Sequence, residues 1–174
     1  MIELIFPNQK PEAEIQFMQA YDNYSRNILR HIYIRVSNRS AAEDILSETF
    51  LKTWQFLRQG QEIKNLKSFL YKVANNLIID YYRKKSDRPV SLTDLIKEPA
   101  AEAPSAQDLV DKQFSDVFLK KYLDKLPPRY REIIIYRYLD ELSIKEIKQI
   151  TGKTAANIYV MLHRGLKLLK GSLK

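Results

Sequence analysis

Cysteine is absent from this sequence of 174 residues, and histidine occurs only twice. The absence of cysteine excludes disulfides and cysteine-based zinc sites. The two histidines, His31 and His163, lie far apart in the chain, so the sequence indicates neither a metal cluster nor a histidine-based catalytic triad. No apolar run is long enough to span a bilayer, and residues 1–6 are too short and lack the basic flank of a signal peptide. We therefore expect a cytoplasmic protein that holds no cofactor.

Acidic residues are in the minority, because 29 Lys and Arg stand against 21 Asp and Glu, which gives a net charge of +8. The excess of basic residues is distributed unevenly along the chain. Residues 64–88 carry a net charge of +5 and residues 120–174 a net charge of +8, whereas residues 89–119 carry −4. Two cationic blocks separated by an anionic one favour two separate contacts with a polyanion such as nucleic acid.

The most informative stretch is 142–170, which has the pattern of two short helices joined by a tight turn. Ser143 and Glu146 have capping-box spacing at the start of the first helix. Gly152 stands where a left-handed residue ends that helix, and Thr154 can cap the second one. The pattern predicts a helix-turn-helix whose second helix enters a DNA major groove, and the alternative is a helical hairpin that only packs. We expect an apolar stripe of Ile158, Leu162, Leu166 and Leu169, and a DNA-facing side of Thr154, Asn157, Tyr159, Val160, His163 and Arg164.

An acidic helix is predicted earlier in the chain, between Ser40 and Leu57. Ser40 and Glu43 again have capping-box spacing, and Ala42, Leu46, Phe50, Trp54 and Leu57 recur at the spacing of a buried face. The opposite face carries Glu43, Asp44, Ser47 and Glu48. Paired-carboxylate catalysis is a poor explanation, since an open helix face has no pocket and no burial to separate the pKa values of its acids. A docking face for a basic partner and a merely solvated face remain the alternatives.

The next helix begins at Asn65 or Ser68, runs to Lys85 and follows a loop, residues 58–64, that is hinged at Gly60. Its inner stripe is Leu66, Leu70, Val73, Leu77 and Tyr81, and its opposite side carries Lys72, Asn76, Asp80 and Arg83. Amide and guanidinium groups at this spacing can contact base edges, while Lys84, Lys85 and Arg88 can neutralise phosphates. Tyr71 and Tyr82 flank this helix, either as stacking surfaces for unpaired bases or as core residues.

The remaining pattern completes an all-α protein of two small helical domains. A long amphipathic helix is predicted from about Glu12 to Val36, with His31 as a packing or surface residue. Prolines, small residues and acids fill the stretch after Ser86, which predicts an extended linker. Pro128 fits the first turn of the helix that leads into the helix-turn-helix. We expect an N-terminal domain at 1–86, an acidic linker at 87–106 and a C-terminal domain at 107–174.

Two stretches together resemble a known family. AEDILSETFLKTW and SFLYKVANNLIIDYYRKK are similar to the promoter-melting domain of bacterial sigma factors, and LDKLPPRYREIIIYRYLDELSIKEIKQITGK, followed by LHRGLKLL, resembles their C-terminal helix-turn-helix domain. The two-domain plan is similar to that of the extracytoplasmic-function (ECF) group. The resemblance implies a transcription initiation factor that is not an enzyme. Such a factor binds core RNA polymerase and promoter DNA, and it is held by an anti-sigma factor.

The resemblance also implies roles for individual residues. Asp44, Ser47 and Glu48 would dock on the clamp helices of the largest polymerase subunit, where the family usually has Asp, Gln and Glu. Lys72, Asn76, Asp80, Arg83 and Lys84 fall in the helix that meets the minus-ten element, and the 58–64 loop would hold a flipped base.

The recognition helix departs from the family pattern, which commonly has Lys and Arg where this chain has Tyr159 and Met161. Base contacts then fall to Asn157 and His163, thymine-methyl contacts to Tyr159 and Val160, and phosphate contacts to Arg164 and Lys167, which predicts an upstream element rich in A·T. The alternatives are a stand-alone helix-turn-helix regulator and a nuclease built on Glu43, Asp44 and Glu48. The nuclease lacks a pocket, metal ligands and a base.

Overall fold

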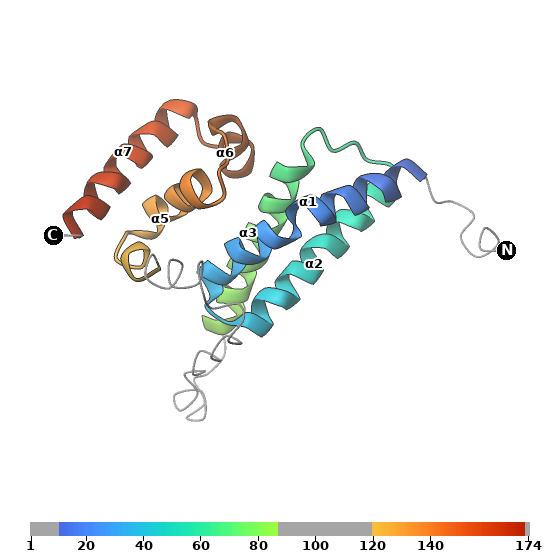
Figure 1. Ribbon diagram of the computed structural model, residues 1–174, viewed down its shortest axis with the longest axis horizontal. Coiled ribbons are helices and arrows are strands. Elements are labelled where there is room, and N and C mark those ends of the chain that lie inside the picture. Colours follow the sequence, from blue (N-terminus) through green and yellow to red (C-terminus); the bar gives the residue numbers. More distant parts are fainter. Residues whose placement is uncertain (1–10, 87–119, 173–174) are drawn as a thin grey trace, which may run out of the picture. The chain divides into compact units, whose positions relative to one another are not determined.

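The computed structural model describes residues 11–86 and 120–172. Every element of regular secondary structure within those ranges is a helix, as the sequence predicts (Figure 1). The chain divides into two compact units, Met1–Arg83 and Lys84–Lys174, which are considered separately below. No helix in the described ranges is both long and apolar enough to cross a membrane. The predicted acidic linker and the first residues of the predicted C-terminal domain, 107–119, lie outside the described residues.

The N-terminal unit consists of α1 (Pro11–Val36), α2 (Arg39–Arg58) and α3 (Leu66–Ser86). Helices α1 and α2 run side by side (Figure 1), and aromatic rings interlock between them: the centroids of Phe17 and Trp54 are 5.2 Å apart and those of Tyr21 and Phe50 are 4.9 Å apart. Such edge and tilted contacts stabilise a pair beyond the apolar area that it buries. The core of the unit includes Ile28, Ile32, Ala42, Phe50, Leu70, Ala74 and Ile78.

The start of α2 differs from the prediction. Asn38, in an extended conformation, is the cap, and its side-chain oxygen accepts a hydrogen bond from the backbone N–H of Ala41 at 2.8 Å. Ser40 is therefore already inside the helix, and Glu43 pairs with Arg39 at 3.0 Å. The predicted Ser40–Glu43 capping box is wrong, because Asn is at least as good a cap as Ser and begins the helix two residues earlier than the box requires. In α3, by contrast, Asn65 is confirmed as the cap, since its side chain accepts from the N–H of Ser68 at 2.9 Å.

The two tyrosines that were predicted to flank α3, Tyr71 and Tyr82, lie in different environments. His31 and Tyr71 are both fully buried, and their rings meet edge to face with centroids 5.1 Å apart. Tyr71 is thus a core residue and cannot stack on a base. Tyr82 keeps 46% of its surface exposed, although its hydroxyl donates a hydrogen bond to the carbonyl oxygen of Arg35.

The C-terminal unit contains α5 (Pro128–Ile134), η1 (Ile135–Leu139), α6 (Ile144–Thr151) and α7 (Ala155–Ser172). Pro128 occupies the first turn of α5, as predicted. After Ile134 the helix widens into a π-helix, on which Tyr138 is exposed. Buried residues of the unit include Leu123, Tyr130, Ile133, Tyr136, Leu142, Ile147 and Ile158.

The inward stripe of α7 also differs from the prediction. Ile158, Met161, Leu162 and Gly165 are buried, whereas Leu166 is exposed. Helix α7 approaches α5 at Gly165, where an added Cβ would lie 2.7 Å from Cδ1 of Ile134. A residue without a side chain permits this approach, and with Gly165 turned inward Leu166, 100° further round the helix, faces solvent. Met161 belongs to the core and does not occupy a base-contacting position.

Candidate functional site

The first candidate surface is the outer face of α2, on which Asp44, Ser47 and Glu48 are all exposed. The three residues lie three and four positions apart, so they share one face of the helix. Glu48 forms an ion pair with Lys52 at 3.2 Å, and the hydroxyl of Ser47 donates to the carbonyl oxygen of Glu43 at 2.9 Å. Asp44 forms no ion pair within the described part of the chain. Its carboxylate is therefore the one most available to a cationic partner.

The second candidate surface lies on α3. Lys72, Asn76 and Arg83 are exposed on it, Asp80 is half-buried, and Arg83 pairs with Asp80 at 3.0 Å. Lys84 follows them and is also exposed. The structure thus brings the predicted residues to one cationic and polar side of the helix, in keeping with their three- and four-residue spacing.

Two hydrogen bonds hold α3 against the end of α1. The Arg35 guanidinium donates to the side-chain oxygen of Asn75, and the Tyr82 hydroxyl donates to the Arg35 carbonyl oxygen. Asn75 immediately precedes Asn76, and Tyr82 immediately precedes Arg83. These bonds fix the rotation of α3 and so set the direction in which Asn76 and Arg83 project.

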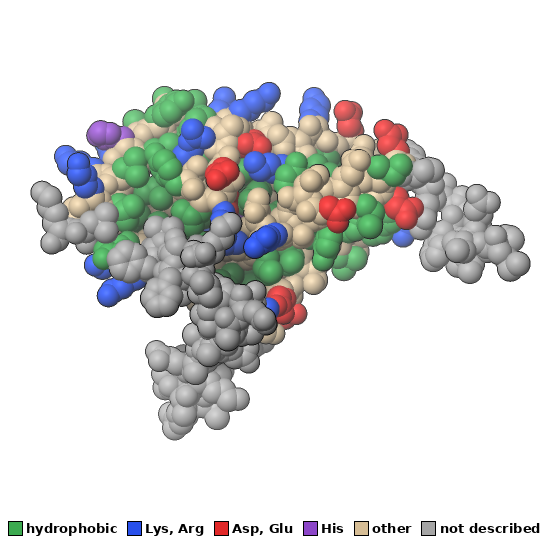
Figure 2. Space-filling model, in the orientation of Figure 1, with side chains coloured by type: hydrophobic (Ala, Val, Ile, Leu, Met, Phe, Trp, Pro, Cys, Tyr) green, Lys and Arg blue, Asp and Glu red, His purple; other side chains and the backbone are tan. Residues whose placement is uncertain are grey.

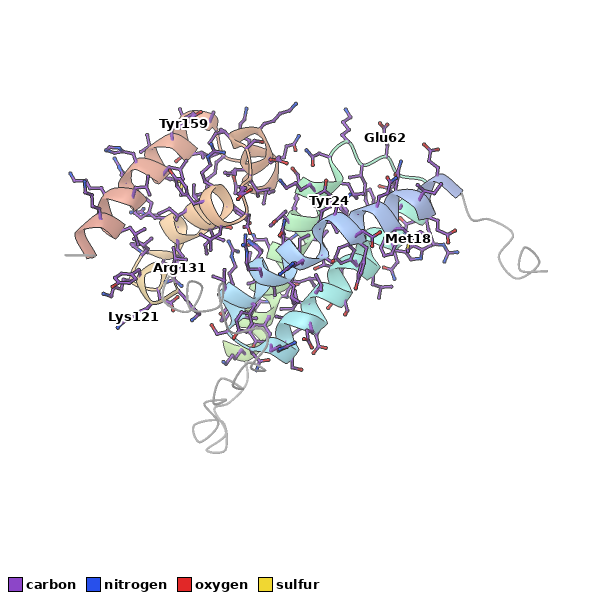
Figure 3. All side chains as sticks on the ribbon, in the orientation of Figure 1. Met18, Tyr24, Glu62, Lys121, Arg131 and Tyr159 are labelled. Atoms are coloured by element: carbon purple, nitrogen blue, oxygen red, sulfur yellow. The ribbon has the colours of Figure 1, made fainter. Side chains whose placement is uncertain are left out.

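The third candidate surface is the helix-turn-helix. The capping box between Ser143 and Glu146 is present in full, Gly152 has a φ of 69°, and the Thr154 hydroxyl accepts from the N–H of Asn157 at 3.3 Å. All three local predictions are confirmed. The predicted DNA-facing residues Thr154, Asn157, Tyr159, Val160, His163, Arg164 and Lys167 are exposed, and Figure 3 shows Tyr159 on the outer side of α7.

A shallow hollow beside α7 contains two cations that the sequence analysis did not identify. It has a volume of about 280 Å³ and is lined by Arg129, Tyr130, Lys153, Asn157, Val160, Met161 and Arg164. The guanidinium of Arg129 lies over the ring of Tyr130, 4.6 Å from its centroid. Three cationic residues, from α5, the turn and α7, therefore line one hollow beside α7. No local sequence signal joins Arg129, Lys153 and Arg164, because only the packing of α5 against α7 brings them together.

Within the part of the chain that the structure describes, no group of three His, Cys, Asp or Glu residues lies close enough to hold a metal ion. The acids of α2 lie on an exposed helix face rather than in a cavity.

These surfaces define a class of protein, namely an all-α DNA-binding factor with a helix-turn-helix unit and a second unit that carries an acidic and a cationic face. Family models agree: Sigma-70 region 2 matches residues 20–88, and Sigma-70, region 4 matches residues 119–169. The ECF RNA polymerase sigma factor SigW of Bacillus subtilis is 30% identical over 183 residues, covering 100% of this chain and 97% of SigW. BldN of Streptomyces coelicolor is 30% identical over 173 residues, and the match spans 97% of this chain and 64% of BldN.

Solved structures show the same fold. The sigma factor RpoE of Bartonella quintana, in complex with the anti-sigma factor NepR, has a TM-score of 0.71 at 23% identity, covering 91% of this chain and 96% of that one. CnrH, in complex with the cytosolic domain of CnrY, has a TM-score of 0.68 at 16% identity, covering 92% and 88%. The chain belongs to the sigma-70 family, in its ECF group. It is therefore a sigma factor, a transcription initiation factor that directs RNA polymerase to promoters, and the stand-alone regulator is not favoured.

Proposed function

We propose that the two units divide the work of promoter recognition. The N-terminal domain, residues 1–86, docks on core RNA polymerase and opens the minus-ten element. The C-terminal domain, residues 107–174, binds the upstream minus-thirty-five element, and residues 87–106 link the two. The protein itself catalyses no reaction. Because polymerase and promoter DNA are its partners, it acts in the cytoplasm.

The observation that carries the proposal is the presence of an acidic face on α2 and a cationic face on α3 in the same three-helix unit. A stand-alone DNA-binding regulator needs neither. Asp44, Ser47 and Glu48 would meet cationic side chains on the clamp helices of the largest polymerase subunit, and complementary charge speeds the association and fixes its register. Asp44 contributes most, because Glu48 must first be released from Lys52.

The face on α3 would hold the opened strand. Lys72, Arg83 and Lys84 neutralise phosphates, while Asn76 and Asp80 contact the edges of unstacked bases. Opening a duplex costs unstacking energy, and a base extruded into the 58–64 loop recovers part of that cost while its identity is read. The Asp80–Arg83 ion pair, 3.0 Å long, orients both side chains before DNA arrives.

Helix α7 would bind upstream DNA in the major groove. Asn157 can form a bidentate contact with adenine, and Tyr159 and Val160 can contact a thymine methyl group, which favours an element rich in A·T. Thr154 and His163 complete the face. The Arg129–Lys153–Arg164 hollow and Lys167 would hold the neighbouring phosphates.

An anti-sigma factor is a further partner under this proposal. Both structural relatives named above were solved in complexes, RpoE with an anti-sigma factor and CnrH with the cytosolic domain of CnrY. A protein that covers the α2 face would prevent docking and keep the factor inactive.

The test is a charge reversal at the proposed docking face. Asp44→Lys should weaken binding to purified core polymerase by tenfold or more, since it places a cation against a cationic surface. Glu141→Lys makes the same change in charge at an exposed residue of the other unit and should leave binding within about twofold of the unchanged protein. Equal affinities for the two variants, measured at low salt, would refute the docking assignment.

A further inference from the structure

The hollow beside α7 combines cations with apolar side chains, and no acid is found among the residues that line it. Arg129, Lys153 and Arg164 form no ion pair within residues 11–86 and 120–172. Like charges that line one hollow repel each other, and a bound anion removes that repulsion. Helix α7 contains no acidic residue, and Figure 2 shows Lys and Arg side chains beside hydrophobic ones on it. The hollow is therefore suited to an anionic ligand.

Arg129 is held in position for such a ligand. Its guanidinium lies over the ring of Tyr130, 4.6 Å from the ring centroid, and this stacking contact restricts the side chain. Tyr130 is itself buried, so its ring is a fixed support. A guanidinium held flat in this way presents paired N–H groups to phosphate oxygens. Because Arg129 is exposed, its guanidinium plane can also stack on the ring of a base.

The hollow is larger than one phosphate group needs. Its volume of about 280 Å³ is close to the lower limit, about 300 Å³, of sites that take small organic ligands. Its lining includes the apolar side chains of Val160 and Met161 and the amide of Asn157. A single phosphate of the DNA backbone uses the cations alone. A nucleotide uses all of these groups, because the faces of its base are apolar and the edges of its base form hydrogen bonds with amides.

We infer that the hollow beside α7 is a binding site for a free nucleotide that carries at least two phosphates. The phosphates lie among the three cations, and the base lies against the apolar side chains. Asn157, Val160 and Arg164 also belong to the proposed DNA-facing side of α7, so a nucleotide in the hollow and DNA on α7 exclude each other. This mutual exclusion rests on the proposed function, whereas nucleotide binding does not.

The first experiment measures ligand binding to the full-length protein alone, by isothermal titration calorimetry without divalent cations. The probes are ADP, inorganic pyrophosphate and adenosine. ADP should bind at least tenfold more tightly than either of the others, because it alone uses both the cations and the apolar side chains. Equal affinities for ADP and pyrophosphate would leave a general anion site and refute the nucleotide assignment. No binding of ADP would refute the site itself.

Two double variants show whether ADP occupies this hollow. Arg129→Gln with Lys153→Gln should bind ADP at least tenfold more weakly than the unchanged protein. Lys145→Gln with Lys148→Gln is the matched control, because it removes two exposed lysines of α6 that do not line the hollow. The control should bind ADP within twofold of the unchanged protein. Equal losses in both variants would mean that ADP responds only to net charge, which contradicts a defined site.

The second experiment measures binding to a labelled A·T-rich duplex by fluorescence anisotropy at constant ionic strength. ADP at ten times its own Kd should raise the apparent Kd for DNA about tenfold, as expected for two ligands that exclude each other. An unchanged DNA affinity in the presence of bound ADP would rule out mutual exclusion. If the protein binds the duplex but not ADP, the inference fails and the proposed DNA contact of α7 stands. If it binds ADP but not the duplex, the DNA contact fails and the nucleotide site stands.

Discussion

The close contact between α5 and α7 leaves no room for a side chain at Gly165, so a large residue there should destabilise the C-terminal unit. At Gly165 the first atom of any side chain would lie 2.7 Å from Cδ1 of Ile134 and 3.2 Å from Cβ of Tyr130. Gly165→Leu places four carbons into this contact, so α7 must move away from α5. Forcing extra carbons into a packed interface costs about 1–3 kcal/mol. Leu is a better helix former than Gly by roughly 0.8 kcal/mol, which offsets a part of that cost.

Gly171 supplies the matched control, because an added Cβ there meets nothing within 4 Å. Gly171→Leu keeps the gain in helix propensity and avoids the clash. We therefore expect Gly165→Leu to destabilise the C-terminal unit by about 2 kcal/mol, while Gly171→Leu leaves its stability unchanged or raises it by roughly 0.5 kcal/mol.

The assay is urea unfolding of the full-length protein, followed by circular dichroism and by tryptophan fluorescence. Trp54 is the only tryptophan and lies in α2, so fluorescence reports the N-terminal unit alone. Gly165→Leu should lower the midpoint of the part of the dichroism signal that comes from the C-terminal unit by about 1 M, since the dependence on urea is typically about 1–3 kcal/mol/M. The fluorescence midpoint should not move. Equal dichroism curves for the two Leu variants would refute the packing argument.

Four further results are expected. Asn38→Ala should cost about 1 kcal/mol in unfolding free energy while Ser40→Ala costs less than about 0.5, because only Asn38 caps α2; equal losses in urea unfolding would contradict this. Arg164→Ala should weaken upstream DNA binding about equally for all sequences and reduce the salt slope by about 1, as measured by titration at several salt concentrations; an unchanged slope would exclude a phosphate contact. Asn157→Ala should instead reduce discrimination at one base pair, by about 1–3 kcal/mol, in a binding series over single-base substitutions, and a uniform loss across that series would contradict base recognition. Tyr82→Phe removes the bond to the Arg35 carbonyl and should slow promoter opening without changing polymerase affinity, as followed by fluorescence of a base analogue at the minus-ten element; unchanged opening would exclude the positioning role of that bond.

Much of the fold is predictable from the sequence because its signals are local. The Ser143–Glu146 box, Gly152 and Pro128 each act within one turn of helix, and each occurs where the pattern places it. The start of α2 is less predictable, since Asn38 and Ser40 are both good caps and lie only two residues apart.

Features that depend on packing between helices are not predictable in this way. Periodicity places Tyr71 on the flank of α3, and only the neighbouring α1 turns that flank into core against His31. The apolar period likewise assigns Leu166 to the interior, but the close approach at Gly165 rotates it outward. The hollow beside α7 is lined by Arg129 and Lys153 as well as Arg164, which no spacing along the chain indicates.

The most direct test of the central claim combines the protein with core polymerase and promoter DNA and maps single-stranded thymines with permanganate. The account predicts a melted minus-ten region only when all three are present, and its loss in a variant with Asn76→Ala and Arg83→Ala that still binds polymerase. Stable association with polymerase at a promoter whose strands stay paired would contradict it.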